Sequence, residues 1–126
     1  MGKRYLIDSN VVIDFSLGKI NENGTEFIAR EIDEGPIISV INKIELLGFP
    51  VVTQEILDFV EAAEILNLTD TVIQKTIKLR KKHKIKLPDA IIAASAIVNK
   101  LGLITRNVKD FEKIKGLIVI NPYRIS

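Results

Sequence analysis

Four carboxylates in this chain follow or open apolar segments, at places where folding could gather them into one site. They lie far apart in the sequence and are Asp8, Glu45, Asp89 and Asp110. Clustered carboxylates repel one another, so their pKa values rise unless a cation neutralises them. Oxygen ligands around an open cleft suit Mg²⁺ or Mn²⁺. Such an ion activates a bound water and stabilises charge on a phosphodiester, so the pattern points to metal-dependent hydrolysis.

Asp89 has the most informative surroundings of the four acids. Pro88 precedes it and suits the first position of a helix, where its missing N–H leaves no partner unsatisfied. The residues from Ala90 to Val98 are almost entirely apolar, which is typical of a helix buried on most sides. The small alanines in it allow close packing on a sheet. We therefore expect Asp89 to be held at the rim of a core.

Each acid also has a purely structural explanation. Asp8 and Asp110 are suited to cap the helices that follow them. Asp89 favours the positive end of its own helix dipole, and Glu45 alone is explained as a solvated helix charge. The prediction of a site therefore depends on their joint placement. A fifth acid, Asp14, is expected to lie on the surface.

Short apolar runs alternate with helical patterns along the whole chain. The expected strands are 5–7, 37–40, 65–68, 103–105 and 117–120. The expected helices are 10–17, 25–33, 41–47, 53–63, 70–82, 87–98 and 108–113. Strands separated by helices predict an α/β fold, a three-layer α/β/α sandwich whose central sheet is mainly parallel. No repeat or linker interrupts the pattern, so we expect a single domain over 1–126.

Composition narrows the function classes only modestly. The chain has 126 residues, of which 47% are hydrophobic, enough for one domain with a substantial core. A net charge of +2 is too small to indicate a nucleic-acid partner, so any basic footprint must be local. The lack of cysteine excludes disulfides, thiolate metal sites and a cysteine nucleophile. Without a signal peptide or a membrane-spanning apolar stretch, we expect a cytoplasmic protein with no membrane partner.

The order of the elements predicts where the acids meet. In an open parallel sheet, ligands bind beyond the carboxyl ends of the strands. Asp8 directly follows the first expected strand, Glu45 lies on the helix after the second, and Asp110 follows the strand at 103–105. The polar residues expected to support the site there are Ser9, Asn10, Thr105 and Asn107.

A basic run ends just before the apolar helix. Its simplest explanation is a solvated helix end, where cations favour the negative end of the dipole. Its position beside the acidic cleft also suits contacts with backbone phosphate groups. The residues that could make such contacts are Arg80, Lys82 and Lys86. His83 is flanked by cations and expected to be exposed, which makes it a poor general base.

Four segments together resemble the motifs of the PIN-domain family, especially the VapC-like toxin ribonucleases of type II toxin–antitoxin pairs. They occur in the family's order and span nearly the whole chain. The segments are LIDSNVVI at 6–13, INKIELLG at 41–48, LPDAIIAASA at 87–96 and LITRNVKDF at 103–111.

The resemblance implies a central parallel sheet between helices and Mg²⁺- or Mn²⁺-dependent hydrolysis of RNA. It also implies that Asp8, Glu45 and Asp89 are metal ligands. The fourth acidic position is divided in this chain. Many relatives carry an acid where Asn107 stands, and Asp110 is the residue that could supply the charge instead.

The family resemblance further implies protein partners. Its members usually form homodimers, and an antitoxin inserts a segment into the acidic cleft. The apolar faces of 53–66 and 70–82 could bind such an antitoxin or could equally belong to the core. Hydroxyl groups of Ser9 and Thr105 would serve the water shell of the metal or the phosphate.

Two other functions compete with a ribonuclease. One is a binding module for RNA or protein that keeps the fold but has impaired catalysis, an alternative that the neutral Asn107 keeps open. The substitution Asp8→Asn separates the two, because it should abolish cleavage only in an enzyme. The other is a phosphoacceptor receiver domain. It would need a paired acid after the first strand and a lysine after a late one, whereas Ser9 follows Asp8 and Asn121 follows the last strand.

Overall fold

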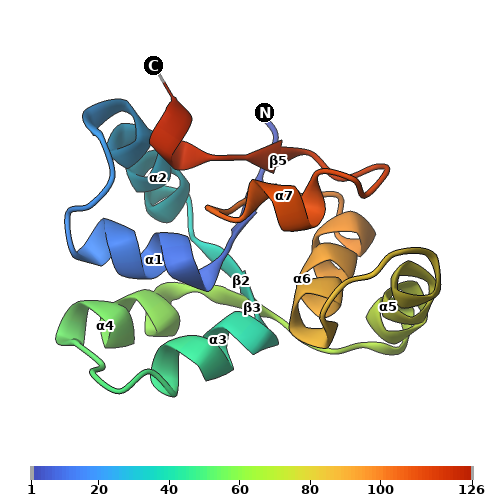
Figure 1. Ribbon diagram of the computed structural model, residues 1–126. Helices are drawn as coiled ribbons and strands as arrows, with labels where there is room; N and C mark the ends of the chain where they lie inside the picture. Colours follow the sequence, from blue (N-terminus) through green and yellow to red (C-terminus); the bar gives the residue numbers. More distant parts are fainter. Residues whose placement is uncertain (1, 126) are drawn as a thin grey trace.

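Within residues 2–125, which the computed structural model describes, five short parallel strands form one sheet at the centre of the molecule (Figure 1). The strands are β1 (Tyr5–Ile7), β2 (Ile37–Ser39), β3 (Glu64–Leu66), β4 (Gly102–Ile104) and β5 (Val119–Ile120). Their order across the sheet is β3-β2-β1-β4-β5. Strand β1 is therefore central and pairs with both β2 and β4.

Helices connect the strands. They are α1 (Ser9–Ser16), α2 (Glu22–Asp33), α3 (Val40–Leu47), α4 (Gln54–Ala62), α5 (Asp70–Lys82), α6 (Leu87–Val98), α7 (Val108–Phe111) and the 3₁₀ helix η1 (Pro122–Arg124). Helix starts leave backbone N–H groups without partners, and short polar side chains satisfy them. The side chains that do so for α1 to α5 are Asp8, Asn21, Ser39, Thr53 and Thr69. No helix in the described part of the chain is long and apolar enough to cross a membrane.

The strands divide the core into two halves, because successive side chains point to opposite faces of a sheet. Leu6 packs into one half and Ile7 into the other, and Ile37 and Ile38 do the same in β2. Helices α5, α6 and α7 cover the first half, and α1 to α4 cover the second (Figure 1). The predicted three-layer α/β/α fold with a parallel sheet is thus confirmed.

Helix α6 is apolar on nearly all sides because the sheet covers one side of it and α5 covers another. It packs on the sheet through the first core half and against α5 along its length. Every residue from Ala90 to Ala96 is buried. Asp89 stands in the first turn of this helix and is half-buried, as the sequence predicted. The helix packing fixes where that carboxylate points.

Some element boundaries differ from the expected ones for identifiable reasons. Helix α2 begins at Glu22 rather than Thr25, because the Asn21 side chain accepts a 2.8 Å hydrogen bond from the Gly24 N–H. Strand β5 begins at Val119, and Leu117, two residues earlier, packs into the first half of the core instead of extending the strand.

The two apolar faces, 53–66 and 70–82, belong mainly to the core. Ile56 and Val60 of α4 pack in the core half shared with α1, and Val72 and Leu79 of α5 pack in the half shared with α6. The large apolar side chains on these segments that lie exposed are Leu57 and Ile77.

Candidate active site

Three of the four predicted acids line one cavity of about 510 Å³. Asp8, Glu45 and Asp89 contribute to its wall, together with Ser9, Asn10 and Asn107. Asp8 follows β1, and Asn107 belongs to the segment that follows β4. Because β2 and β4 lie on opposite sides of β1, the chain connections run in opposite directions from this point, which is where open α/β sheets bind ligands.

The Asp8 carboxylate is held by four hydrogen-bond donors. Oδ1 accepts from the backbone N–H of Ser9 (2.9 Å) and from Asn42 Nδ2 (3.2 Å). Oδ2 accepts from Thr105 Oγ1 (2.8 Å) and from Asn10 Nδ2 (3.4 Å). The residue is only 6% exposed. Its orientation is therefore fixed by groups from α1, α3 and the end of β4 together.

Burial raises the pKa of the Asp8 carboxyl, and the hydrogen bonds from Thr105, Ser9, Asn42 and Asn10 oppose that rise without cancelling it. The charged form is thus less favourable in the folded protein than in water.

The pKa of Asp89 is also raised. Burial is the largest cause, followed by the negative charges of Asp8, Asp110 and Glu45, while Lys86 lowers the pKa. These acids therefore repel one another across the cleft. A cation placed among them would relieve that repulsion.

Glu45 joins the same network through Ser9. Ser9 Oγ donates a 2.7 Å hydrogen bond to Glu45 Oε1 and accepts one from Asn42 Nδ2 (3.0 Å). Asn42, which is completely buried, was not predicted from the sequence. The signal for it was the Ser39-x-x-Asn42 capping box at the start of α3. Asn42 Oδ1 caps the helix by accepting from the Ser39 N–H (2.9 Å), and its amide nitrogen serves the site.

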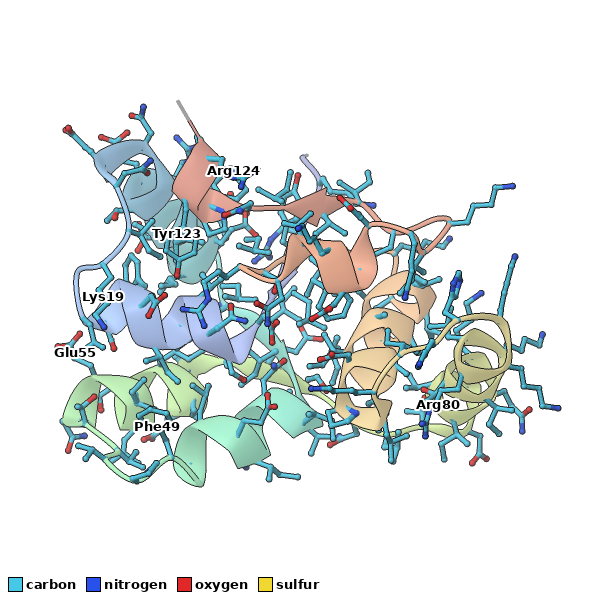
Figure 2. All side chains as sticks on the ribbon, viewed as in Figure 1. Lys19, Phe49, Glu55, Arg80, Tyr123 and Arg124 are labelled. Atoms are coloured by element: carbon cyan, nitrogen blue, oxygen red, sulfur yellow. The ribbon has the colours of Figure 1, made fainter. Side chains whose placement is uncertain are left out.

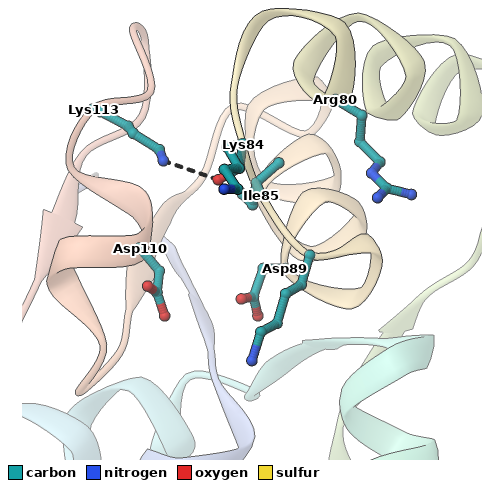
Figure 3. A pocket seen from close by; sticks show the side chains of 7 residues that line it. Arg80, Lys84, Ile85, Asp89, Asp110 and Lys113 are labelled. Carbon is teal, nitrogen blue, oxygen red and sulfur yellow. Dashed lines mark hydrogen bonds between the residues drawn. The ribbon is translucent and has the colours of Figure 1, made fainter.

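Two residues lie near the fourth acidic position of the site. Asn107 lines the cavity of the three acids, and its N–H donates to Thr105 Oγ1 (3.1 Å). Asp110 lines a neighbouring cavity of about 460 Å³, which it shares with Asp89. Figure 3 shows Asp89 and Asp110 on the two sides of this second cavity. That Asp110 supplies the charge of the fourth acidic position, in place of an acid at Asn107, stays a prediction.

Basic side chains line the second cavity. Arg80 and Lys86, two of the three predicted backbone contacts, contribute to its wall, whereas Lys82 does not. Lys84 and Lys113 also line it, and Lys113 Nζ donates a 3.1 Å hydrogen bond to the Lys84 carbonyl (Figure 3). Lys84 belongs to the basic run seen in the sequence, but only the fold brings Lys113 beside it.

Two expectations about exposure were wrong. Asp14 is not a surface residue but is 8% exposed, because the side chains of Arg106 and Tyr123 cover it and donate hydrogen bonds to Oδ2. His83 is half-buried rather than exposed, at the point where α5 ends and the chain turns towards α6.

The acids do not form a ready-made metal cage. Within residues 2–125, no three His, Cys, Asp or Glu side chains are arranged so that they could hold an ion by themselves. Mg²⁺ and Mn²⁺ do not need such a cage, because Mg²⁺ is usually held by one or two carboxylates and keeps several waters. The carboxylate and amide oxygens around this cavity fit an ion of that kind.

Comparisons with known proteins agree with one another. A family profile described as PIN domain matches residues 5–117. A toxin–antitoxin complex from Klebsiella pneumoniae contains a chain that is 33% identical, with a TM-score of 0.71 over 96% of this chain and 99% of that chain. VapBC2 from Rickettsia felis, bound to a DNA fragment from its promoter, gives a TM-score of 0.74 at 23% identity, over 93% of this chain and 97% of that chain. DNA-bound VapBC from Salmonella typhimurium gives a TM-score of 0.76 at 20% identity, over 96% of this chain and 99% of that chain. No curated protein sequence matches the chain.

Proposed function

Because this chain belongs to the PIN domain family and shares its fold with VapBC toxin–antitoxin structures, we propose that it is a metal-dependent endoribonuclease. In this proposal it hydrolyses RNA phosphodiester bonds and is the toxin of a toxin–antitoxin pair. The observation that carries the proposal is the convergence of Asp8, Glu45 and Asp89 on one cavity beside the central strand.

The acids are the groups that would hold Mg²⁺ or Mn²⁺. Asp8, Glu45 and Asp89 would bind it directly or through water, and Asn107 or Asp110 would complete the set. Burial raises the pKa of Asp89 most, and the negative charges of the neighbouring acids raise it further; that repulsion supports a cation at this place. When bound, the ion would supply an activated water and stabilise negative charge on the phosphate.

The neighbouring side chains have supporting tasks in this proposal. Thr105, Asn42 and Asn10 keep the Asp8 carboxylate in one orientation. Ser9 does the same for Glu45. A group held in advance loses little freedom when the reaction proceeds, which favours a fast step.

The cations of the second cavity would bind the RNA backbone. Arg80 and Lys86 supply positive charge next to Asp89, and Lys84 and Lys113 add to it. Electrostatic contacts of this kind are independent of base sequence. They would therefore position an RNA strand across the acids without selecting its sequence.

We further propose an antitoxin partner, a homodimer and a cytoplasmic location, where RNA is available. The antitoxin proposal is supported by the 33% identical chain, which comes from a toxin–antitoxin complex. It is also supported by exposed apolar side chains on α3 and in the loop after it. These side chains are Ile44, Leu47, Phe49 and Val51. Exposed apolar groups that lie together often mark protein interfaces.

The second candidate function is a binding module without catalysis. One observation favours it, namely the neutral Asn107 at the wall of the cavity that the three acids share. Such a module would bind RNA or protein in the same cleft.

One experiment separates the two functions. The purified protein is incubated with labelled RNA and Mg²⁺, Mn²⁺ or EDTA, and the variant Asp89→Asn is compared with Asp33→Asn, an exposed acid on α2. An enzyme cleaves RNA with either metal, stops with EDTA, and loses at least about a hundredfold in rate only in Asp89→Asn. Metal-dependent cleavage that persists in Asp89→Asn at the wild-type rate would indicate a contaminating nuclease and contradict the proposal.

A further inference from the structure

Asp14 is a buried acid that has no task in the proposed metal chemistry. It lies on α1, six positions after Asp8, and it lines the main cavity, the one that Asp8, Glu45 and Asp89 share. A buried carboxylate is unfavourable unless hydrogen bonds or charges stabilise it. The side chains that donate hydrogen bonds to Asp14 are therefore also the ones that Asp14 holds in place.

Two side chains from distant parts of the sequence meet on Asp14 Oδ2. Arg106 Nη1, from the segment between β4 and α7, donates a 3.0 Å hydrogen bond. The Tyr123 hydroxyl, from η1, donates a second one. Burial and the adjacent Asp14 raise the pKa of Tyr123, so its phenol keeps its proton and remains a donor at neutral pH.

The main chain around Arg106 is tied to the acids. The Arg106 N–H donates to Asn10 Oδ1 (3.2 Å), and Asn10 also donates to Asp8. The backbone carbonyl of Asp14 in turn accepts a 2.9 Å hydrogen bond from the Lys19 N–H. Arg106 and Lys19 both line the main cavity, so this connected set places two cations on its α1 side.

The exposure of Arg106 argues against a purely structural role. Its side chain is 53% exposed, and ion pairs with that much solvent contribute little to stability. Its Nη1 donates to Asp14, and the guanidinium also lies beside the Tyr123 hydroxyl. A guanidinium carries five N–H donors, which is more than these contacts use, so donors remain for another acceptor. Guanidinium groups match the oxygens of phosphates particularly well.

The position of Arg106 complements the cations already described. Figure 2 shows Arg80 on the α5 side of the molecule, whereas Lys19 and Tyr123 lie beside α1. The acids lie between these two sides, because Asp89 lines both the main cavity and the Arg80 cavity. An RNA strand that crosses the acids and contacts Arg80 on one side would meet Arg106 on the other.

We propose that Arg106 binds a backbone phosphate of the RNA on the α1 side of the acidic cleft, and that Asp14 and Tyr123 position its guanidinium for that contact. This inference rests on the proposed function, because it assigns a contact to the same RNA. Arg106 is the contacting residue, whereas Asp14 and Tyr123 are positioning residues.

The test measures binding separately from cleavage. A fluorescein-labelled single-stranded RNA is titrated with protein in EDTA, where metal-dependent cleavage cannot occur. The affinity is measured by fluorescence anisotropy at KCl concentrations from about 50 to about 300 mM, over which salt increasingly screens the charges. Arg106→Gln is expected to weaken binding about tenfold at low salt. It should also reduce the slope of log affinity against log salt by about 0.7, the value for one phosphate contact on a single strand.

Three further variants make the result specific. Arg106→Lys, which keeps the charge, should restore the slope and most of the affinity. Arg30→Gln removes an exposed arginine on α2 and should leave both unchanged. Tyr123→Phe should weaken binding less than Arg106→Gln, and adding it to Arg106→Gln should have no further effect, because it acts through that side chain. A general structural defect would instead weaken the double variant further.

Either of two results would overturn the inference. One is a wild-type slope and affinity in Arg106→Gln, and the other is an equal loss in Arg30→Gln. Failure of the proposed function is seen elsewhere, as equal metal-dependent cleavage by the wild type and Asp89→Asn, so the two failures are distinguishable. Thermal unfolding of each variant verifies that it is folded.

Discussion

Asn42 offers the sharpest test of how the site is held together. It is completely buried and makes three hydrogen bonds, one from the Ser39 N–H to its Oδ1 and two from its Nδ2 to Asp8 and Ser9. Asn42→Ala removes all three at once. Asp8 keeps its other donors and Ser9 keeps Glu45, so neither of them is left without a partner.

The expected loss follows from these contacts. Three hydrogen bonds contribute roughly 1 kcal/mol each, and the buried Ser39 N–H, left without its acceptor, adds about 1 kcal/mol or more. We therefore expect Asn42→Ala to lower the free energy of unfolding by about 4 kcal/mol. For a domain of this size that corresponds to a fall in Tm of roughly 15 °C.

The assay is urea and thermal unfolding in EDTA, with Asn23→Ala as the matched control. Asn23 is an exposed asparagine on α2, and its replacement should change the free energy of unfolding by less than about 0.5 kcal/mol. A loss below about 1 kcal/mol in Asn42→Ala would refute the reasoning. It would mean that the hydrogen bonds of Asn42 stabilise the folded state no more than hydrogen bonds to water would.

Two other predictions concern stability. Asp8 and Asp89 have folded pKa values above the ordinary 3.8, so the folded state binds their protons more tightly and, in EDTA, their contribution to stability falls as the pH rises from about 3.8 through the raised values. Urea unfolding from pH 4 to 7 should therefore show a smaller decline in Asp89→Asn than in the wild type, and an equal or larger decline would contradict the assigned shift. Gly24→Ala should destabilise the protein by about 1–3 kcal/mol in the same assay, because its Cβ would clash with the Pro122 carbonyl oxygen; unchanged stability would show that η1 moves aside freely.

Local patterns predicted the fold well because the relevant forces are local. The apolar strands, the capping residues and the uniformly apolar α6 each have a recognisable sequence signature. Asp8 and Asp89 were predicted as site residues because each stands at the end of such an element. The cavity that joins them with Glu45 is consistent with the expected place at the edge of the sheet.

Contacts between distant segments were not predictable in the same way. Asn42 was hidden because one side chain both caps a helix and donates to Asp8, 34 positions earlier. Asp14 resembled any polar residue on an amphipathic helix until Arg106 and Tyr123 covered it, from 92 and 109 positions away. Sequence periodicity describes one element at a time, whereas these partners are set by how the elements pack.

The position of β1 divides the cleft into parts of different local stability. Asp8 follows a strand paired on both sides, and its own N–H donates to the Ile104 carbonyl, so exposing it requires breaking the middle of the sheet. Tyr123 follows β5, a strand of two residues at the sheet edge, so exposing it breaks fewer strand contacts than exposing Asp8 does. Amide hydrogens near Asp8 should therefore exchange only through global unfolding, while those around η1 exchange through local opening. The acids of the cleft should therefore persist through fluctuations that transiently release the Tyr123 hydroxyl from Asp14.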